Sequence, residues 1–151
     1  MHFPNILFLL CGALSFYGIG LIWSMELITL RSWMVVDDTE LFHKVRGVHW
    51  RVLPYLVFIP TGILVLCSTI LLWVHPAKIL FPLLLLAVLI QYMILVLTGS
   101  MWGRWERKIS AEHQSSTSPL MKRLRETHWI RTALITLNGL IFFLLLISTY
   151  S

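Results

Sequence analysis

Apolar residues along the chain gather in four long blocks that are separated by three polar connections. Each block is long enough to form a helix that crosses roughly 30 Å of hydrocarbon. The second and third blocks are separated only by residues 75–78, which predicts two neighbouring antiparallel helices. We therefore predict an all-α, four-helix transmembrane bundle in a single domain over residues 1–151, with spans at residues 6–30, 52–74, 79–101 and 130–150.

The composition supports a chain built for lipid. Hydrophobic residues make up 58% and charged residues 13% of the sequence, against about 45–50% and about 25% in soluble domains. These values exclude a disordered chain, a disulfide scaffold and almost any soluble enzyme of this size. The expected partner is the lipid bilayer, joined by a hydrophobic small molecule or a partner membrane protein, and no nucleic acid is expected.

Basic residues are concentrated on one side of the predicted membrane. Eleven of the twelve lysines and arginines lie in or beside the two longer connections, and only Lys78 lies in the short one. Cytoplasmic loops of membrane proteins carry such an excess of positive charge. We therefore predict that both long connections are cytoplasmic, that both termini lie on the non-cytoplasmic side, and that the protein resides in a bacterial inner membrane.

The sequence contains an internal repeat at an offset of 79 residues. Residues 39–50 align without gaps with residues 118–129, and four positions match exactly: Leu41/Leu120, Arg46/Arg125, His49/His128 and Trp50/Trp129. The bundle is therefore predicted to contain two pseudo-repeated helical hairpins, related by a pseudo-two-fold axis along the membrane normal.

The same repeat predicts local features of the helices. Ser118 before Pro119 is typical of a helix N-cap followed by the first helical residue, and Thr39 is expected to cap the equivalent helix. Two pairs of small residues four apart indicate close helix packing, which we expect between the odd-numbered helices: Gly20/Ser24 and Gly99/Gly103. Polar residues deeper in the spans are expected to hydrogen-bond between helices, namely Tyr17, Gln91, Tyr92 and Asn138.

The repeated histidines, His49 and His128, are the first candidates for chemistry. Symmetry would place them at one membrane depth on either side of the axis. Two imidazoles there could bind a metal or haem iron, or hold a quinone-like ligand. The alternative is an interfacial belt in which His, Trp and Arg contact lipid headgroups. No metal ligand set is predicted, because neither histidine has a carboxylate or cysteine at tight spacing, and the sequence identifies no cofactor.

Glu26 is the second candidate, because an ionisable residue inside a span is costly and usually faces the bundle interior. One interpretation is an ion pair with Arg31 or another cytoplasmic arginine. The other is a proton acceptor or ligand group beside the histidine pair. The repeat counterpart of Glu26 is Trp105, and the adjacent Glu106 could take the equivalent role.

Two segments carry a family resemblance. Residues 124–132, Leu-Arg-Glu-Thr-His-Trp-Ile-Arg-Thr, and residues 42–51, which precede Pro54 and Pro60, resemble small four-helix bacterial membrane proteins of unknown function. That group is similar to the anthrone oxygenase-like proteins. The resemblance implies the four-helix fold. It also implies, for the best-described relatives, oxidation of anthrone-type polyketides by molecular oxygen without an obvious cofactor.

Two functional hypotheses follow. The first is an accessory or lipid- or partner-binding membrane module. The second is a small membrane oxidoreductase or oxygenase that acts on a hydrophobic aromatic or quinone-like substrate at the cytoplasmic interface. In the second, His49, His128 and Glu26 would be acid/base or ligand groups. The substrate would then be held by repeated basic and aromatic residues: Arg46, Arg125, Arg131, Trp50 and Trp129.

Overall fold

A computed structural model describes residues 3–150, and within that range all regular secondary structure is helical. The elements form four long rods. The first rod contains α1 (Phe3–Ser24), the π-helical turn η1 (Met25–Thr29) and α2 (Leu30–Met34); the second contains α3 (Thr39–Leu53), η2 (Pro54–Phe58) and α4 (Ile59–Val74); the third contains α5 (Phe81–Leu97), η3 (Thr98–Trp102) and α6 (Gly103–Ala111); the fourth is α7 (Pro119–Tyr150).

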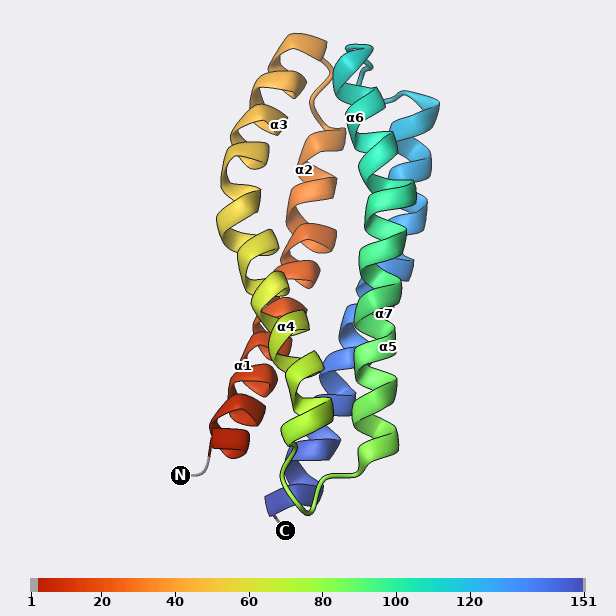
Figure 1. Cartoon of the computed structure of the whole chain (residues 1–151). Coiled ribbons are helices and arrows are strands. Elements are labelled where there is room, and N and C mark those ends of the chain that lie inside the picture. Colours follow the sequence, from red (N-terminus) through yellow and green to blue (C-terminus); the bar gives the residue numbers. More distant parts are fainter. Residues whose placement is uncertain (1–2, 151) are drawn as a thin grey trace.

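The rods are arranged as a ring. α1 packs against α4 and α7, and α5 also packs against α4 and α7, so α1 and α5 occupy opposite corners. The start of α1, the end of α7 and the α4–α5 connection lie at one end of the bundle, and the other two connections lie at the opposite end (Figure 1). Each rod is long and apolar enough to cross a membrane. The predicted all-α four-helix bundle is confirmed, and the chain is an integral membrane protein whose helices contact lipid.

Two side chains cap the helices that carry the repeated segments. The amide of Met121 donates to the hydroxyl of Ser118 at 3.2 Å, and α7 begins at Pro119, as predicted. In the first copy the amide of Leu41 donates to the carboxylate of Asp38 at 2.9 Å, so the cap lies one residue before the expected Thr39. Aspartate caps as well as threonine and also favours the positive end of the helix dipole.

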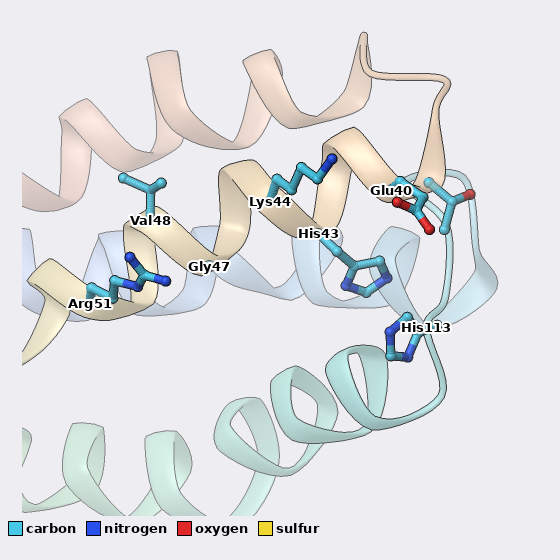
Figure 2. A pocket seen from close by; sticks show the side chains of 8 residues that line it. Glu40, His43, Lys44, Gly47, Val48, Arg51 and His113 are labelled. Carbon is cyan, nitrogen blue, oxygen red and sulfur yellow. The ribbon is translucent and has the colours of Figure 1, made fainter.

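The two long connections are tied together at their end of the bundle. The hydroxyl of Ser116 donates to the carbonyl of Val36 at 2.8 Å. His43 Nε2 lies 3.1 Å from the carbonyl oxygen of Gln114, which accepts its hydrogen bond. These contacts bring His113 of the α6–α7 connection beside α3 (Figure 2).

Three of the rods contain a π-helical turn. In η2 the cause is local: Pro54 has no amide hydrogen, and its carbonyl accepts from the amide of Ile59, five residues on. η1 contains Glu26 and η3 ends at Trp102. Such turns appear frequently at functional sites, and Glu26 and Trp102 both belong to the site described below.

The predicted packing of small residues between the odd-numbered helices is wrong. Gly20 and Gly99 have open space where a Cβ would be, because α1 and α5 lie at opposite corners. Close approach occurs instead between α1 and α7. A Cβ at Gly12 would lie 2.8 Å from Leu146 Cδ1, and a Cβ at Gly139 would collide with Ile19.

The bundle has two apolar clusters. One fills the end near the termini and joins α1, α4, α5 and α7, with a buried set that includes Phe8, Cys11, Leu71, Leu84, Phe142 and Leu145. The other lies toward the long connections, with Leu30, Trp33, Phe42, Trp102, Ile109, Met121 and Leu124. Ionisable residues from all four rods lie in this second half, where Glu26, Arg46 and His128 are buried and Glu106 and Arg131 are partly buried, and they form the candidate site.

Candidate functional site

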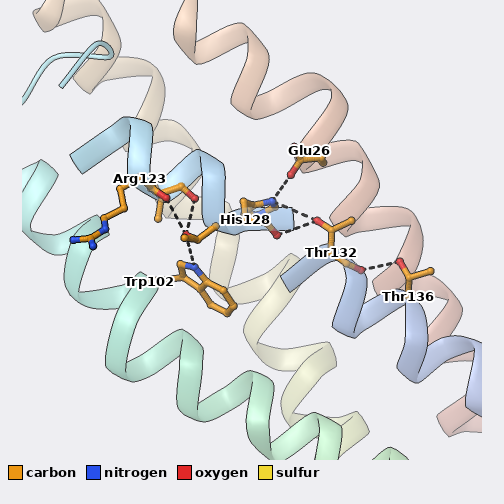
Figure 3. Close-up of polar contacts among 8 residues, drawn as sticks. Glu26, Trp102, Arg123, His128, Thr132 and Thr136 are labelled. Atoms are coloured by element: carbon orange, nitrogen blue, oxygen red, sulfur yellow. Dashed lines mark hydrogen bonds and ion pairs between the residues drawn. The ribbon is translucent and has the colours of Figure 1, made fainter. Parts of the chain in front are cut away.

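Glu26 and His128 form a buried pair between η1 and α7. Nδ1 of His128 lies 2.6 Å from Oε2 of Glu26, and the two side chains are only 3% and 6% exposed. The hydroxyl of Thr132, one turn further along α7, lies 3.5 Å from the same nitrogen and donates to the His128 carbonyl (Figure 3). Nε2 of His128 donates when His128 is an imidazolium paired with the Glu26 carboxylate, and it accepts when the imidazole is neutral.

This pair decides between interpretations that the sequence left open. The partner of Glu26 is a histidine, so the expected ion pair with Arg31 or another arginine is wrong. His128 is 2% exposed, and a side chain so deeply buried does not contact headgroups as part of an interfacial belt. Its neighbour Trp129 is 46% exposed and does face outward.

A second buried pair joins α3 to α6. Nη2 of Arg46 lies 2.7 Å from Oε2 of Glu106, with side-chain exposures of 2% and 16%. The guanidinium carbon of Arg46 lies 5.6 Å from the ring centroid of Trp33 and 5.4 Å from that of Phe42. Both distances fit cation–π contacts. Glu106, which follows Trp105, the repeat counterpart of Glu26, is therefore a second acidic group inside the bundle.

A cluster of aromatic side chains links Arg46 to Arg131. Arg46 stacks on Trp33 and Phe42, which belong to the same buried cluster as Trp102. The guanidinium carbon of Arg131 lies 4.4 Å from the Trp102 ring centroid, at the end of η3. Side chains from all four rods therefore meet in one buried region.

Several nitrogen atoms of these helices are buried without partners. Among the described residues, nine buried side-chain polar atoms have no hydrogen-bond partner, and six of these are nitrogens on α3 and on the first turns of α7. These atoms are Nε and Nη1 of Arg46, Nε2 of His49, Nε1 of Trp50, Nε2 of His128 and Nε of Arg131. We call the five residues that carry them the donor cluster. Guanidinium and indole nitrogens only donate, so the complement of this cluster is a group rich in acceptor oxygens.

Leaving such atoms unpaired is costly. A buried polar group without a partner costs about 1–3 kcal/mol, and most buried polar groups in proteins are paired. Arg46, His49 and Trp50 lie on one face of α3, at spacings of three and four residues. His128 and Arg131 have the same relation on α7. The unpaired atoms therefore come from two opposing helix faces rather than from scattered positions.

The repeat predicted Arg125 and Trp129 as equivalents of Arg46 and Trp50, but the structure places them elsewhere. Arg125 donates from Nη1 to the sulfur of Met34 at 2.6 Å and is outside the donor cluster. The ring of Trp129 packs edge-to-face on Trp23 with centroids 5.5 Å apart. Trp23 and Trp129 border an outward-facing groove of about 310 Å³ between α1 and α7.

That groove reaches a residue that the sequence reasoning missed. Thr132 lines it and also contacts His128 in the interior. The stacking partners Trp33 and Trp102 are likewise absent from the candidate residues that the sequence indicated. Thr132 could have been found from the sequence, because it lies four residues after His128 and therefore on the same face of a helix.

No three histidine, cysteine, aspartate or glutamate side chains within residues 3–150 come together as a group that could hold a metal ion. The two cysteines, Cys11 and Cys67, are free thiols buried in the other half of the bundle. The groups available for chemistry are therefore imidazole, carboxylate, guanidinium and indole.

Comparisons with known proteins yield no relative. No protein-family model, no curated protein and no solved structure matches the chain. Function is therefore inferred from the geometry of the donor cluster and the two ion pairs.

Proposed function

We propose that the protein is a membrane module that binds a lipid-soluble molecule with an oxygen-bearing, quinone-like head, and that the donor cluster holds this head inside the bundle. The observation that carries the proposal is the six buried nitrogen atoms without partners. Two arginines in this region are balanced by Glu26 and Glu106. A neutral carbonyl head therefore suits the site better than a multiply charged anion.

The distribution of basic residues along the chain indicates in which leaflet the head is bound. The donor cluster lies in the half of the bundle nearest the two basic connections. With the positive charge on the cytoplasmic side, the head is held in the cytoplasmic leaflet of a bacterial inner membrane and the termini lie outside. The ring order supports two related hairpins, because each buried glutamate pairs with the even-numbered rod of the other hairpin.

A second function is favoured by the Glu26–His128 pair. A histidine whose Nδ1 is held by a carboxylate can accept a proton at Nε2, and Nε2 of His128 has no other partner. In this role the protein is an oxidoreductase or oxygenase that uses molecular oxygen as the oxidant. His128 takes the proton of a phenolic or quinol hydroxyl, the substrate becomes an oxyanion, and Glu26 stabilises the imidazolium. The resemblance to anthrone oxygenase-like proteins supports the same reaction class.

The binding proposal is tested by titrating decylubiquinone into detergent-purified protein and following tryptophan fluorescence. We expect saturable quenching, because Trp50 and Trp102 lie at the site. Replacements His128→Ala and Arg131→Met should each weaken the apparent affinity about tenfold. His75→Ala, at the opposite end of the bundle, is the matched control and should leave it unchanged. Quenching that never saturates, or that is equal in all variants, would contradict the proposal.

The enzymatic role is distinguished by a second replacement. Glu26→Gln keeps a hydrogen-bonding side chain of similar size beside His128 but removes the negative charge. If His128 acts as a base, this variant should bind decylubiquinone within a fewfold of the wild type yet lose oxidation of a quinol or anthrone substrate. Equal turnover by the variant and the wild type would exclude the acid/base role.

A further inference from the structure

A separate hollow lies outside the bundle, between α3 and the α6–α7 connection. Its volume is about 730 Å³, and it is lined by one face of α3 together with His113 (Figure 2). It shares no lining residue with the donor cluster. Any ligand that it binds is therefore additional to the one proposed above.

Two cations in the hollow are without ion-pair partners. Lys44 and Arg51 both line it and take part in none of the ion pairs formed by the described residues. Elsewhere on the same end of the protein, Lys108 and Lys122 each have a glutamate four residues on. Seven residues separate Lys44 from Arg51, so their Cα atoms are about 10 Å apart along one face of the helix. One carboxylate, Glu40, lines the hollow beyond Lys44.

A histidine pair forms the other wall. The rings of His43 and His113 have centroids 4.9 Å apart, and Nε2 of His43 is fixed on the Gln114 carbonyl. His113 is the only non-glycine residue among residues 3–150 with a positive φ, at 47°. This conformation is unfavourable for a side chain with a Cβ, and such strain clusters at functional sites. Here it places the His113 ring against His43.

The hollow also extends along the helix toward the membrane. Val48 lines it beside Arg51 and is 63% exposed, and Val52, one residue after Arg51, is 41% exposed. Val52 begins the span predicted over residues 52–74, and the rod Thr39–Val74 is apolar enough to cross a membrane. A ligand in the hollow therefore meets cations and imidazoles at one end and lipid-facing valines at the other.

We propose that this hollow binds the headgroup of an anionic phospholipid. The phosphate lies between Lys44 and Arg51, the rest of the headgroup contacts His43 and His113, and the acyl chains run beside Val48. A soluble phosphate compound would use the same cations but would gain nothing from the valine end. The bound lipid would bridge α3 and the α6–α7 connection, which belong to different hairpins.

The test is native mass spectrometry of the purified full-length protein with added phosphatidylglycerol or phosphatidylcholine. We expect at least one phosphatidylglycerol to bind at least tenfold more tightly than phosphatidylcholine. The double replacement Lys44→Gln/Arg51→Gln should abolish that preference. The double replacement Lys108→Gln/Lys122→Gln removes the same charge elsewhere and should retain it. Loss of the preference in both double variants, or in neither, would overturn the proposal.

Two further arms complete the test. His113→Ala should weaken phosphatidylglycerol binding severalfold, whereas His75→Ala should have no effect; equal binding by both variants would contradict the role of the histidine wall. Inorganic phosphate at millimolar concentration should not displace the lipid. If inorganic phosphate displaced phosphatidylglycerol at concentrations similar to the Kd of the lipid, the hollow would be a site for soluble phosphate, and the assignment to lipid would be overturned.

Discussion

Two groups of buried polar side chains in the bundle differ in how completely they are hydrogen-bonded. In the half near the termini, Ser68 donates to Gln91 at 2.6 Å, Gln91 donates to Asn138 at 3.3 Å, and Asn138 donates to the Ala87 carbonyl at 2.8 Å. No side-chain atom of these three residues is left unpaired. In the other half, the donor cluster leaves six nitrogens without partners. A satisfied network holds helices together, whereas an unsatisfied one is suited to a ligand.

The largest effect is expected from breaking the Arg46–Glu106 pair. Glu106→Ala leaves the buried Arg46 charge unpaired, which should lower the free energy of unfolding by about 3–5 kcal/mol. Denaturant titration in detergent measures this. Glu126→Ala is the control, because its pair with Lys122 at 3.9 Å is exposed and should contribute at most about 1 kcal/mol. Equal losses in the two variants would show that the buried pair has no special role.

Disrupting the satisfied network should reduce stability but not binding. Asn138→Leu leaves Nε2 of Gln91 without its acceptor and should cost about 1–3 kcal/mol. Because the network lies apart from the donor cluster, the apparent affinity for decylubiquinone should remain unchanged. A parallel loss of affinity would show that the two polar regions are coupled and would remove the contrast between them.

Two glycines allow a comparison that involves no polar groups: Gly139 lies in the tight contact between α1 and α7, and Gly20 faces open space. Gly139→Leu places a side chain against Ile19 and should destabilise the fold by about 1–3 kcal/mol. Gly20→Ala meets open space and should stabilise the helix by up to about 1 kcal/mol. Thermal unfolding distinguishes the two. If Gly20→Ala destabilised the fold instead, Gly20 would have to lie in a close helix contact, as the sequence first predicted for the odd-numbered helices.

The smallest effect on stability is expected inside the donor cluster. Trp50→Phe removes a buried unpaired N–H, which favours the folded state, and shrinks the ring, which loses packing contacts; because the two effects oppose each other, stability should change by less than about 0.5 kcal/mol. Affinity for decylubiquinone should fall by roughly threefold to tenfold, the value of one hydrogen bond. Trp102→Phe is the contrast, because its N–H donates to Thr127 at 3.0 Å and its loss should cost about 1 kcal/mol. The reverse pattern would contradict the assignment.

The sequence predicted the fold well, because hydropathy and charge report directly on membrane spans. The interhelical hydrogen bonds of Gln91 and Asn138, and those of Tyr17 with Leu56 and Tyr92 with Thr69, were also predictable, since buried polar groups need partners. The Ser118 cap depends on adjacent residues and was found, whereas the cap of the first copy was misplaced by one residue.

The site was only partly predictable. Glu26 and His128 stood out because each is unusual at its position, but their pairing depends on the rotation of two rods and on the π-helical turn at Glu26. The repeat implied equal roles for Arg46 and Arg125, yet Glu106 lies only beside Arg46. The burial of Trp33 and Trp102 could not be derived from hydropathy, which does not show which face of a helix points inward.

The central claim is that Nε2 of His128 faces a ligand within the bundle. Solid-state NMR of protein with ¹⁵N-labelled histidine in lipid bilayers tests it, with the His128 signal assigned by its absence in His128→Ala. Addition of decylubiquinone should shift the Nε2 resonance of His128 and leave the resonances of His43 and His75 unchanged. An unchanged His128 resonance at saturating quinone, or equal shifts at all three histidines, would contradict the account.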